Sequence, residues 1–114
     1  IWFGTRGSGV RISPPRPFQE IKMKYDNMAD LRIELNKIDS SLLSLFKDRF
    51  NLIHEASIIK KNTNEIRDYE RIEEVISGIR SQSEELGLDP NSMEYLWRFL
   101  IELSIRYEID HFDD

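Results

Sequence analysis

The most constraining feature of the 114-residue sequence is a stretch without proline or glycine from Asp26 to about Lys61. Apolar residues recur through it at spacings of three and four, the period of one face of an α-helix. They are Leu31, Leu35, Ile38, Leu42, Leu45, Phe46, Ile53 and Ala56. Asp26 or Asn27 can cap the start. We therefore predict one amphipathic helix of roughly 33 residues, about 50 Å long.

Two shorter helices are predicted after this stretch. Asp68 can cap the second helix, and Gly87 ends it. Asp89 followed by Pro90 is typical of the start of a third. The apolar side of the second helix consists of Tyr69, Ile72, Val75, Ile76, Ile79 and Leu86, and that of the third of Met93, Leu96, Trp97, Leu100, Ile101 and Ile105. Because no strand pattern is present, the predicted fold class is all-α with three helices per chain.

The length of the first helix bears on assembly. Three helices in about 87 residues would leave much of its apolar stripe uncovered in a monomer, and exposed apolar surfaces of that size usually mark interfaces. We therefore predict an intertwined homodimer. The alternative is a break near Ser40–Ser41 that would give a four-helix monomer.

Composition excludes several classes of function. Cysteine is absent and only two histidines are present, His54 and His111, so we expect no metal and no cofactor. We expect His54, about 140° from Arg49 around the helix, to be on the surface. No apolar run reaches the roughly 18 residues of a membrane span, and no secretory signal is recognisable, so we expect a cytoplasmic protein without a membrane partner.

Charge divides the chain in two. Residues 1–27 hold 5 of the 16 basic and 2 of the 21 acidic residues, which leaves 11 basic and 19 acidic residues in 28–114. An acidic body argues against nucleic acid as a partner. Residues 1–22 also carry three of the five glycines and three of the four prolines. We expect residues 1–27 to be a disordered leader, added or translated from upstream, and residues 28–114 to be the helical domain.

Polar residues on the apolar faces are the candidate site. Lys60 follows Arg49 by 11 residues, which at 100° per residue is within about 20° of three whole turns, so both share the core-facing side. Ser104 and Glu108 continue the apolar line of the third helix. Two cations and several hydrogen-bonding groups converging in a helical core would suit a small dianion. The alternative is that these side chains only pack as ion pairs.

Taken in order, these residues resemble the all-helical, AroQ-class chorismate mutases from about Met28 to Phe112. The stretches that carry the resemblance are LRIELNKIDSSLLSLFKDRFNLI, ASIIKK, IRDYERIEEVI, EELGLDP and WRFLIELSIRYEI. The resemblance implies an intertwined helical dimer that binds chorismate, a cyclohexadiene dicarboxylate with an enolpyruvyl ether. It implies no cofactor.

The resemblance also implies roles by position. Arg32 would come from the other subunit and bind one carboxylate, and Arg49 would bind the other. Lys60 would donate to the ether oxygen and a carboxylate. Asp68 would lie at the ring hydroxyl, Ser104 near a carboxylate, and Glu108 opposite the ether oxygen. The rearrangement to prephenate is concerted, so positioning and charge stabilisation suffice without a nucleophile.

Two departures from the family pattern keep alternatives open. Many mutases have glutamine at the position of Glu108, and a glutamate can donate only when protonated, so we expect activity to rise below about pH 6. Ile72 stands where mutases often have a glutamate, and the segment from Lys60 to Ile72 is one residue shorter than in many of them. Both features of that segment resemble the isochorismate-pyruvate lyases, whereas Asp68 followed by Arg71 is closer to the mutases. The alternatives are the lyase, a mutase of an amino-substituted chorismate, and a non-catalytic dimerisation module.

Overall fold

The computed structural model describes residues 24–112 and contains three α-helices and one short 3-10 helix. The helices are α1 (Met28–Ile59), α2 (Tyr69–Leu86) and α3 (Pro90–His111), and the 3-10 helix η1 (Thr63–Glu65) lies between α1 and α2. No strand occurs among the described residues. The predicted all-α class with three helices is therefore confirmed, and η1 is an addition that periodicity did not predict. Most of the predicted leader, residues 1–23, lies outside the described residues.

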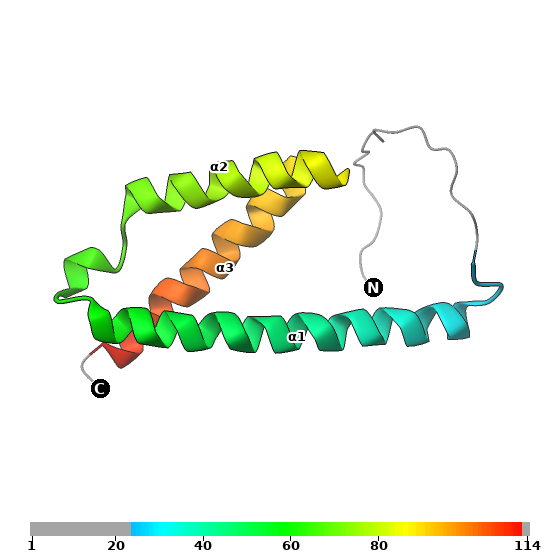
Figure 1. The fold of residues 1–114 in the computed structure, drawn as a ribbon, viewed down its shortest axis with the longest axis horizontal. Coiled ribbons are helices and arrows are strands. Elements are labelled where there is room, and N and C mark those ends of the chain that lie inside the picture. The colour runs from blue at the N-terminus through cyan, green and yellow to red at the C-terminus, as the bar shows by residue number, and fades with distance from the viewer. Residues whose placement is uncertain (1–23, 113–114) are drawn as a thin grey trace.

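The long first helix is continuous. Asn27, one of the two predicted caps, accepts a hydrogen bond from the Asp30 backbone N–H at 2.9 Å. The 32 residues of α1 pass through Ser40–Ser41 without a break, so the four-helix alternative is wrong. In Figure 1, α1 forms a rod, and its N-terminal half extends away from the region that α3 crosses.

Apolar side chains on that N-terminal half are exposed. Those that share one face are Leu35, Ile38, Leu42 and Leu45, which we call the α1 stripe. All four belong to the pattern on which the expectation of a dimer rests. The uncovered stripe is the surface that the expectation requires, and the dimer itself stays a prediction.

Local signals fix the ends of α2 and α3. Asp68 caps α2 by accepting from the Arg71 backbone N–H at 3.1 Å. Gly87 then adopts the left-handed conformation (φ 77°), and the Leu88 N–H returns to the Ser83 carbonyl at 2.8 Å, the pattern of a Schellman turn. Asp89 caps α3, whose first residue is Pro90. This tight connection makes α2 and α3 a helical hairpin (Figure 1).

The hydrophobic core lies within this hairpin and at Ile66, which follows η1, and α3 also packs against α1. Its buried residues are Ile66, Ile76, Ile101 and Ile105, against which Ile72, Val75, Trp97 and Phe112 pack. Arg98 joins α2 to α3 by donating to Glu73 and Glu94 at 2.7 to 3.0 Å. These hydrogen bonds hold the pKa of both carboxyls below the usual value.

Three other expectations concern residues 24–112. Within this range no helix is long and apolar enough to span a membrane, and no group of three potential metal-ligating side chains occurs. The expected surface position of His54 is wrong: its ring is half-buried, and Nδ1 lies 3.3 Å from the Tyr107 hydroxyl. Because His54 is offset by 140° from Arg49 around α1, its ring faces away from Arg49 and contacts Tyr107 on α3.

Candidate functional site

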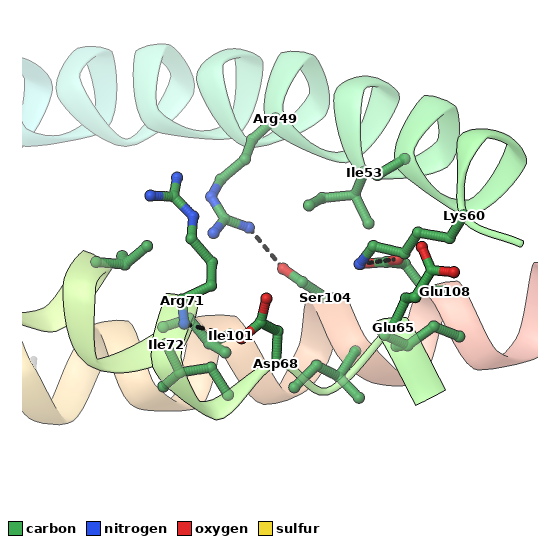
Figure 2. Close-up of a pocket in the computed structure, with 14 residues that line it drawn as sticks. Arg49, Ile53, Lys60, Glu65, Asp68, Arg71, Ile72, Ile101, Ser104 and Glu108 are labelled. Atoms are coloured by element: carbon green, nitrogen blue, oxygen red, sulfur yellow. Dashed lines mark hydrogen bonds and ion pairs between the residues drawn. The ribbon is translucent and has the colours of Figure 1, made fainter. Parts of the chain in front are cut away.

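A pocket of about 370 Å³ lies where the C-terminal half of α1, the η1 segment, α2 and α3 meet. Its wall combines an apolar surface with six ionisable side chains. The apolar residues are Ile53, Ala56, Ile66, Ile72, Val75, Ile101 and Ile105, and the ionisable residues are Arg49, Lys60, Glu65, Asp68, Arg71 and Glu108. Ser104 completes the lining. Figure 2 shows these side chains pointing into the space between α1 and the other helices.

Arg49 extends from α1 and places its positively charged guanidinium in the pocket. Its Nη1 donates to Ser104 Oγ at 2.5 Å, and Ser104 in turn donates to the Leu100 carbonyl at 2.9 Å. Burial lowers the pKa of the half-buried Arg49 guanidinium, which still stays charged at neutral pH. Because the hydroxyl is neutral, it leaves the positive charge of Arg49 free to bind an anion.

Lys60 and Glu108 form the second polar element. Lys60 is the C-terminal cap of α1, and its Nζ donates to Glu108 Oε1 at 2.7 Å. The Glu108 side chain is 5% exposed and that of Lys60 is 24% exposed. A carboxylate so far from water requires a cationic partner, which Lys60 supplies. The pair therefore places an ammonium donor at the pocket wall.

The start of α2 supplies the third polar element. Asp68 uses one carboxylate oxygen as the helix cap, and Arg71, one turn later, pairs with exposed Glu74 at 2.7 Å. Ile72 lies beside them on the pocket wall. Glu65 enters from η1, where its carboxylate accepts from the Lys61 backbone N–H at 3.3 Å.

The structure brings together most of the residues predicted for the site. Its pocket is lined by Arg49, Lys60, Asp68, Ile72, Ser104 and Glu108. Arg32 is absent from this lining: it is exposed, 17 residues before Arg49 and so about 25 Å away along α1. This position agrees with the expectation that Arg32 serves another subunit's pocket, an expectation that one chain does not test.

Two charged lining residues were not among the predicted site residues. Arg71 follows Asp68 by three, so the helical period would have placed it on the same side of α2. Glu65 had no such signal, because η1 interrupts the periodicity between α1 and α2. An apolar cavity with arginine and lysine donors can bind carboxylates and stabilise charge growing on an oxygen atom.

A known protein family matches most of the chain. A family model described as chorismate mutase type II matches residues 31–109, from the first half of α1 almost to the end of α3. The matched range contains every side chain of the pocket lining and also Arg32. No curated protein matches the chain.

Proposed function

The chain belongs to the chorismate mutase type II family, and from this premise we propose that its pocket rearranges chorismate to prephenate. The supporting observation is the convergence of Arg49, Ser104, Lys60 and Glu108 on one apolar cavity. We assign the activity to a domain of residues 28–114. The substrate is a small dicarboxylate, which fits a site whose cations are held by burial and hydrogen bonding.

The proposed mechanism needs only positioning and electrostatics. In the reaction the ether C–O bond breaks while a C–C bond forms between the enolpyruvyl methylene and the ring, so no group leaves. Arg49, whose guanidinium is positioned by Ser104, binds one carboxylate, and Lys60 donates to the ether oxygen as negative charge grows on it. A donor placed at such an oxygen is worth about 10²- to 10³-fold in rate.

Glu108 orients the Lys60 side chain in this scheme. As a carboxylate it accepts from Lys60 and orients the ammonium. A carboxylate cannot donate to the ether oxygen, whereas an amide at this position could, so we propose that Glu108→Gln is more active than wild type at neutral pH.

The second carboxylate requires a second cation, which we assign to Arg32 of the partner subunit in an intertwined homodimer. Support comes from the exposed α1 stripe and from the exposure of Arg32 on the same half of α1. The test is subunit mixing: Arg32→Ala and Arg49→Ala are each expected to be inactive. After joint unfolding and refolding, half of the dimers would be mixed, and each would hold one intact site.

The expected result of mixing is a return of about a quarter of the wild-type activity. Refolding each variant alone is the control and should restore none. If the mixture stays as inactive as the separate variants, Arg32 and Arg49 do not serve one site from two subunits.

A specific observation favours a second candidate, the isochorismate-pyruvate lyase. Apolar Ile72 lines the pocket where mutases often have a glutamate that binds the ring hydroxyl. The deciding experiment incubates the protein with chorismate and, separately, isochorismate at pH 5 and pH 7.5, and follows prephenate and salicylate. Prephenate from chorismate supports the mutase; salicylate from isochorismate transfers the assignment to the lyase. Neither product would leave a helical module in which the charges serve packing.

A further inference from the structure

The segment that connects α1 to α2 is tied to α3 at both of its ends. At the first end, Lys60 donates to Glu108 at 2.7 Å. At the second end, Arg67 donates from Nη1 and Nη2 to the two carboxylate oxygens of Glu102, each at 2.8 Å. Glu102 precedes Glu108 by six residues, about 9 Å along the axis of α3. The connecting segment is therefore held against α3 by two ion pairs, and part of it lines the pocket.

The second ion pair, Arg67 with Glu102, has the geometry of a clamp. Two parallel N–H···O bonds match the planar fork of an arginine to a carboxylate, so they restrict orientation as well as distance. These bonds hold the pKa of the Glu102 carboxyl below its usual value. The Arg67 guanidinium also lies 6.0 Å from the centre of the Tyr69 ring, within reach of a cation–π contact. Because Tyr69 is the first residue of α2, this pair, which we call the Arg67 clamp, joins the start of α2 to α3.

Other contacts do little to fix the start of α2. Within the described residues, α3 packs against both other helices, whereas α1 and α2 hardly contact each other directly. Residues 61–65 of the connecting segment are exposed, and Ile66, at 4% exposed, is their one buried neighbour before α2. The position of Asp68, two residues later, therefore depends on Ile66 and on the Arg67 clamp.

Asp68 carries the atom that this clamp would position. One of its carboxylate oxygens accepts from the Arg71 backbone N–H at 3.1 Å as the cap of α2. Asp68 also lines the pocket, and in Figure 2 its carboxylate points toward Ser104. Among residues 24–112 the second oxygen has no hydrogen-bond partner, so it can accept from a hydroxyl of a bound molecule. The family resemblance places the ring hydroxyl of the substrate at Asp68, and this oxygen is available for that contact.

We propose that Arg67 is a positioning residue of the pocket and acts through Asp68. By fixing the first turn of α2 on α3, the Arg67 clamp holds the Asp68 carboxylate where the ring hydroxyl of the substrate binds. This inference rests on the proposed function and adds to it a residue outside the pocket lining. The ring hydroxyl takes no part in the bonds that break and form. Loss of the clamp should therefore weaken binding of the substrate and of the transition state alike, which raises KM and leaves kcat nearly unchanged.

The test measures kcat and KM for chorismate in Arg67→Gln and in Glu102→Gln. Each change should raise KM by about three- to fivefold, the size of one well-aligned exposed ion pair, and should leave kcat within about twofold of wild type. The direction of the change separates positioning from simple charge. Because the substrate is a dianion, an effect of charge alone would raise KM in Arg67→Gln but lower it in Glu102→Gln.

The matched control is Arg80→Gln. The Arg80 side chain is 40% exposed, against 38% for Arg67, and it also joins α2 to α3, by pairing with Glu94 at 2.8 Å. Neither Arg80 nor Glu94 lines the pocket, so this variant should leave KM unchanged.

A double-variant cycle shows whether Arg67 acts through Asp68. Asp68→Ser can still cap α2 but lacks the second carboxylate oxygen, so it should raise KM by itself. Adding Arg67→Gln to Asp68→Ser should then raise KM by less than about twofold further, because the clamp would have no carboxylate to position. Far-ultraviolet circular dichroism should show the helix content of wild type in every variant.

The outcomes separate this inference from the proposed function. If chorismate is rearranged, an unchanged or lower KM in Glu102→Gln, an equal rise in Arg80→Gln or full additivity with Asp68→Ser would overturn the inference and leave the mutase assignment intact. Loss of helix content in Arg67→Gln would also overturn it, because the clamp would then serve folding. Absence of chorismate turnover by wild type would instead remove the proposed function and the inference with it.

Discussion

The Lys60–Glu108 pair gives the sharpest test of the energetics of the pocket. Lys60→Met keeps an unbranched side chain but leaves Glu108, 4% exposed, without its cation. Removing one partner of a buried pair costs about 3 to 5 kcal/mol, and the lower value applies because Lys60 is 24% exposed. For a domain of this size, about 3 kcal/mol corresponds to a fall in Tm of about 12 to 24 °C.

The double variant Lys60→Met/Glu108→Gln separates the pair from ordinary loss of contacts. It holds no buried charge, so it should recover about 2 of the 3 kcal/mol, the rest being the cost of an amide with fewer partners. Lys60→Met should also lose about 10²- to 10³-fold in kcat, because it lacks the proposed lysine donor to the ether oxygen.

The assay is urea unfolding followed by far-ultraviolet circular dichroism, at one protein concentration because dimer stability depends on it. Lys61→Met, at the exposed neighbouring lysine, is the control and should change the unfolding free energy by less than about 0.5 kcal/mol. A double variant no more stable than Lys60→Met would refute the reasoning, since the loss would not come from an unpaired carboxylate.

Three further predictions concern other parts of the molecule. Glu108→Gln should be more active than wild type at pH 7.5, because an amide can donate to the ether oxygen and a carboxylate cannot; a kcat equal to or below that of wild type would contradict this. Arg98 lowers the pKa of the two carboxyls that it bonds, so its contribution to stability is present above their unfolded pKa and is lost as pH falls through the folded pKa. Arg98→Gln should therefore lose less stability than wild type between pH 7 and pH 3 in urea unfolding; parallel losses would show that this pairing does not contribute. Gly87→Ala should cost about 1 kcal/mol because the residue has φ 77°, whereas Gly78→Ala, in mid-helix with open space around it, should gain about 0.5 to 1 kcal/mol; equal effects in thermal unfolding would be inconsistent with this backbone argument.

The sequence predicts the helices well because each end carries its own local signal. Asn27, Asp68 and Asp89 cap the three helices, and Gly87 ends α2, all as residue type and position indicated. The short helix η1 escaped prediction because its three residues cannot show a period and contribute no buried side chain. The packing of α3 across α1 depends on contacts between residues far apart in the chain, and these leave no signal in local spacing.

The site was predictable where it lies on a helix and not elsewhere. Four polar residues stand out on apolar helix faces: Arg49 and Lys60 on the first helix, and Ser104 and Glu108 on α3. Helical geometry alone therefore placed the two members of each pair on one face of their helix. That the two pairs converge followed from the expectation that both apolar faces meet in one helical core. Glu65 was missed because its place depends on how the chain turns between α1 and α2.

In the proposed homodimer, assembly and catalysis would be linked by the dielectric environment of the pocket. In one chain, Arg49 is half-buried and Lys60 is 24% exposed, so water screens the charges that would act on the substrate. Interaction between two charges strengthens as the surrounding medium becomes less polar, from about 1 kcal/mol in water at 4 Å to about 4 kcal/mol near a protein surface. A second copy that covers the α1 stripe would exclude water from this surface and deliver Arg32 in the same step. The long first helix would then serve catalysis in two ways, by supplying a cation and by raising the strength of those already in the pocket.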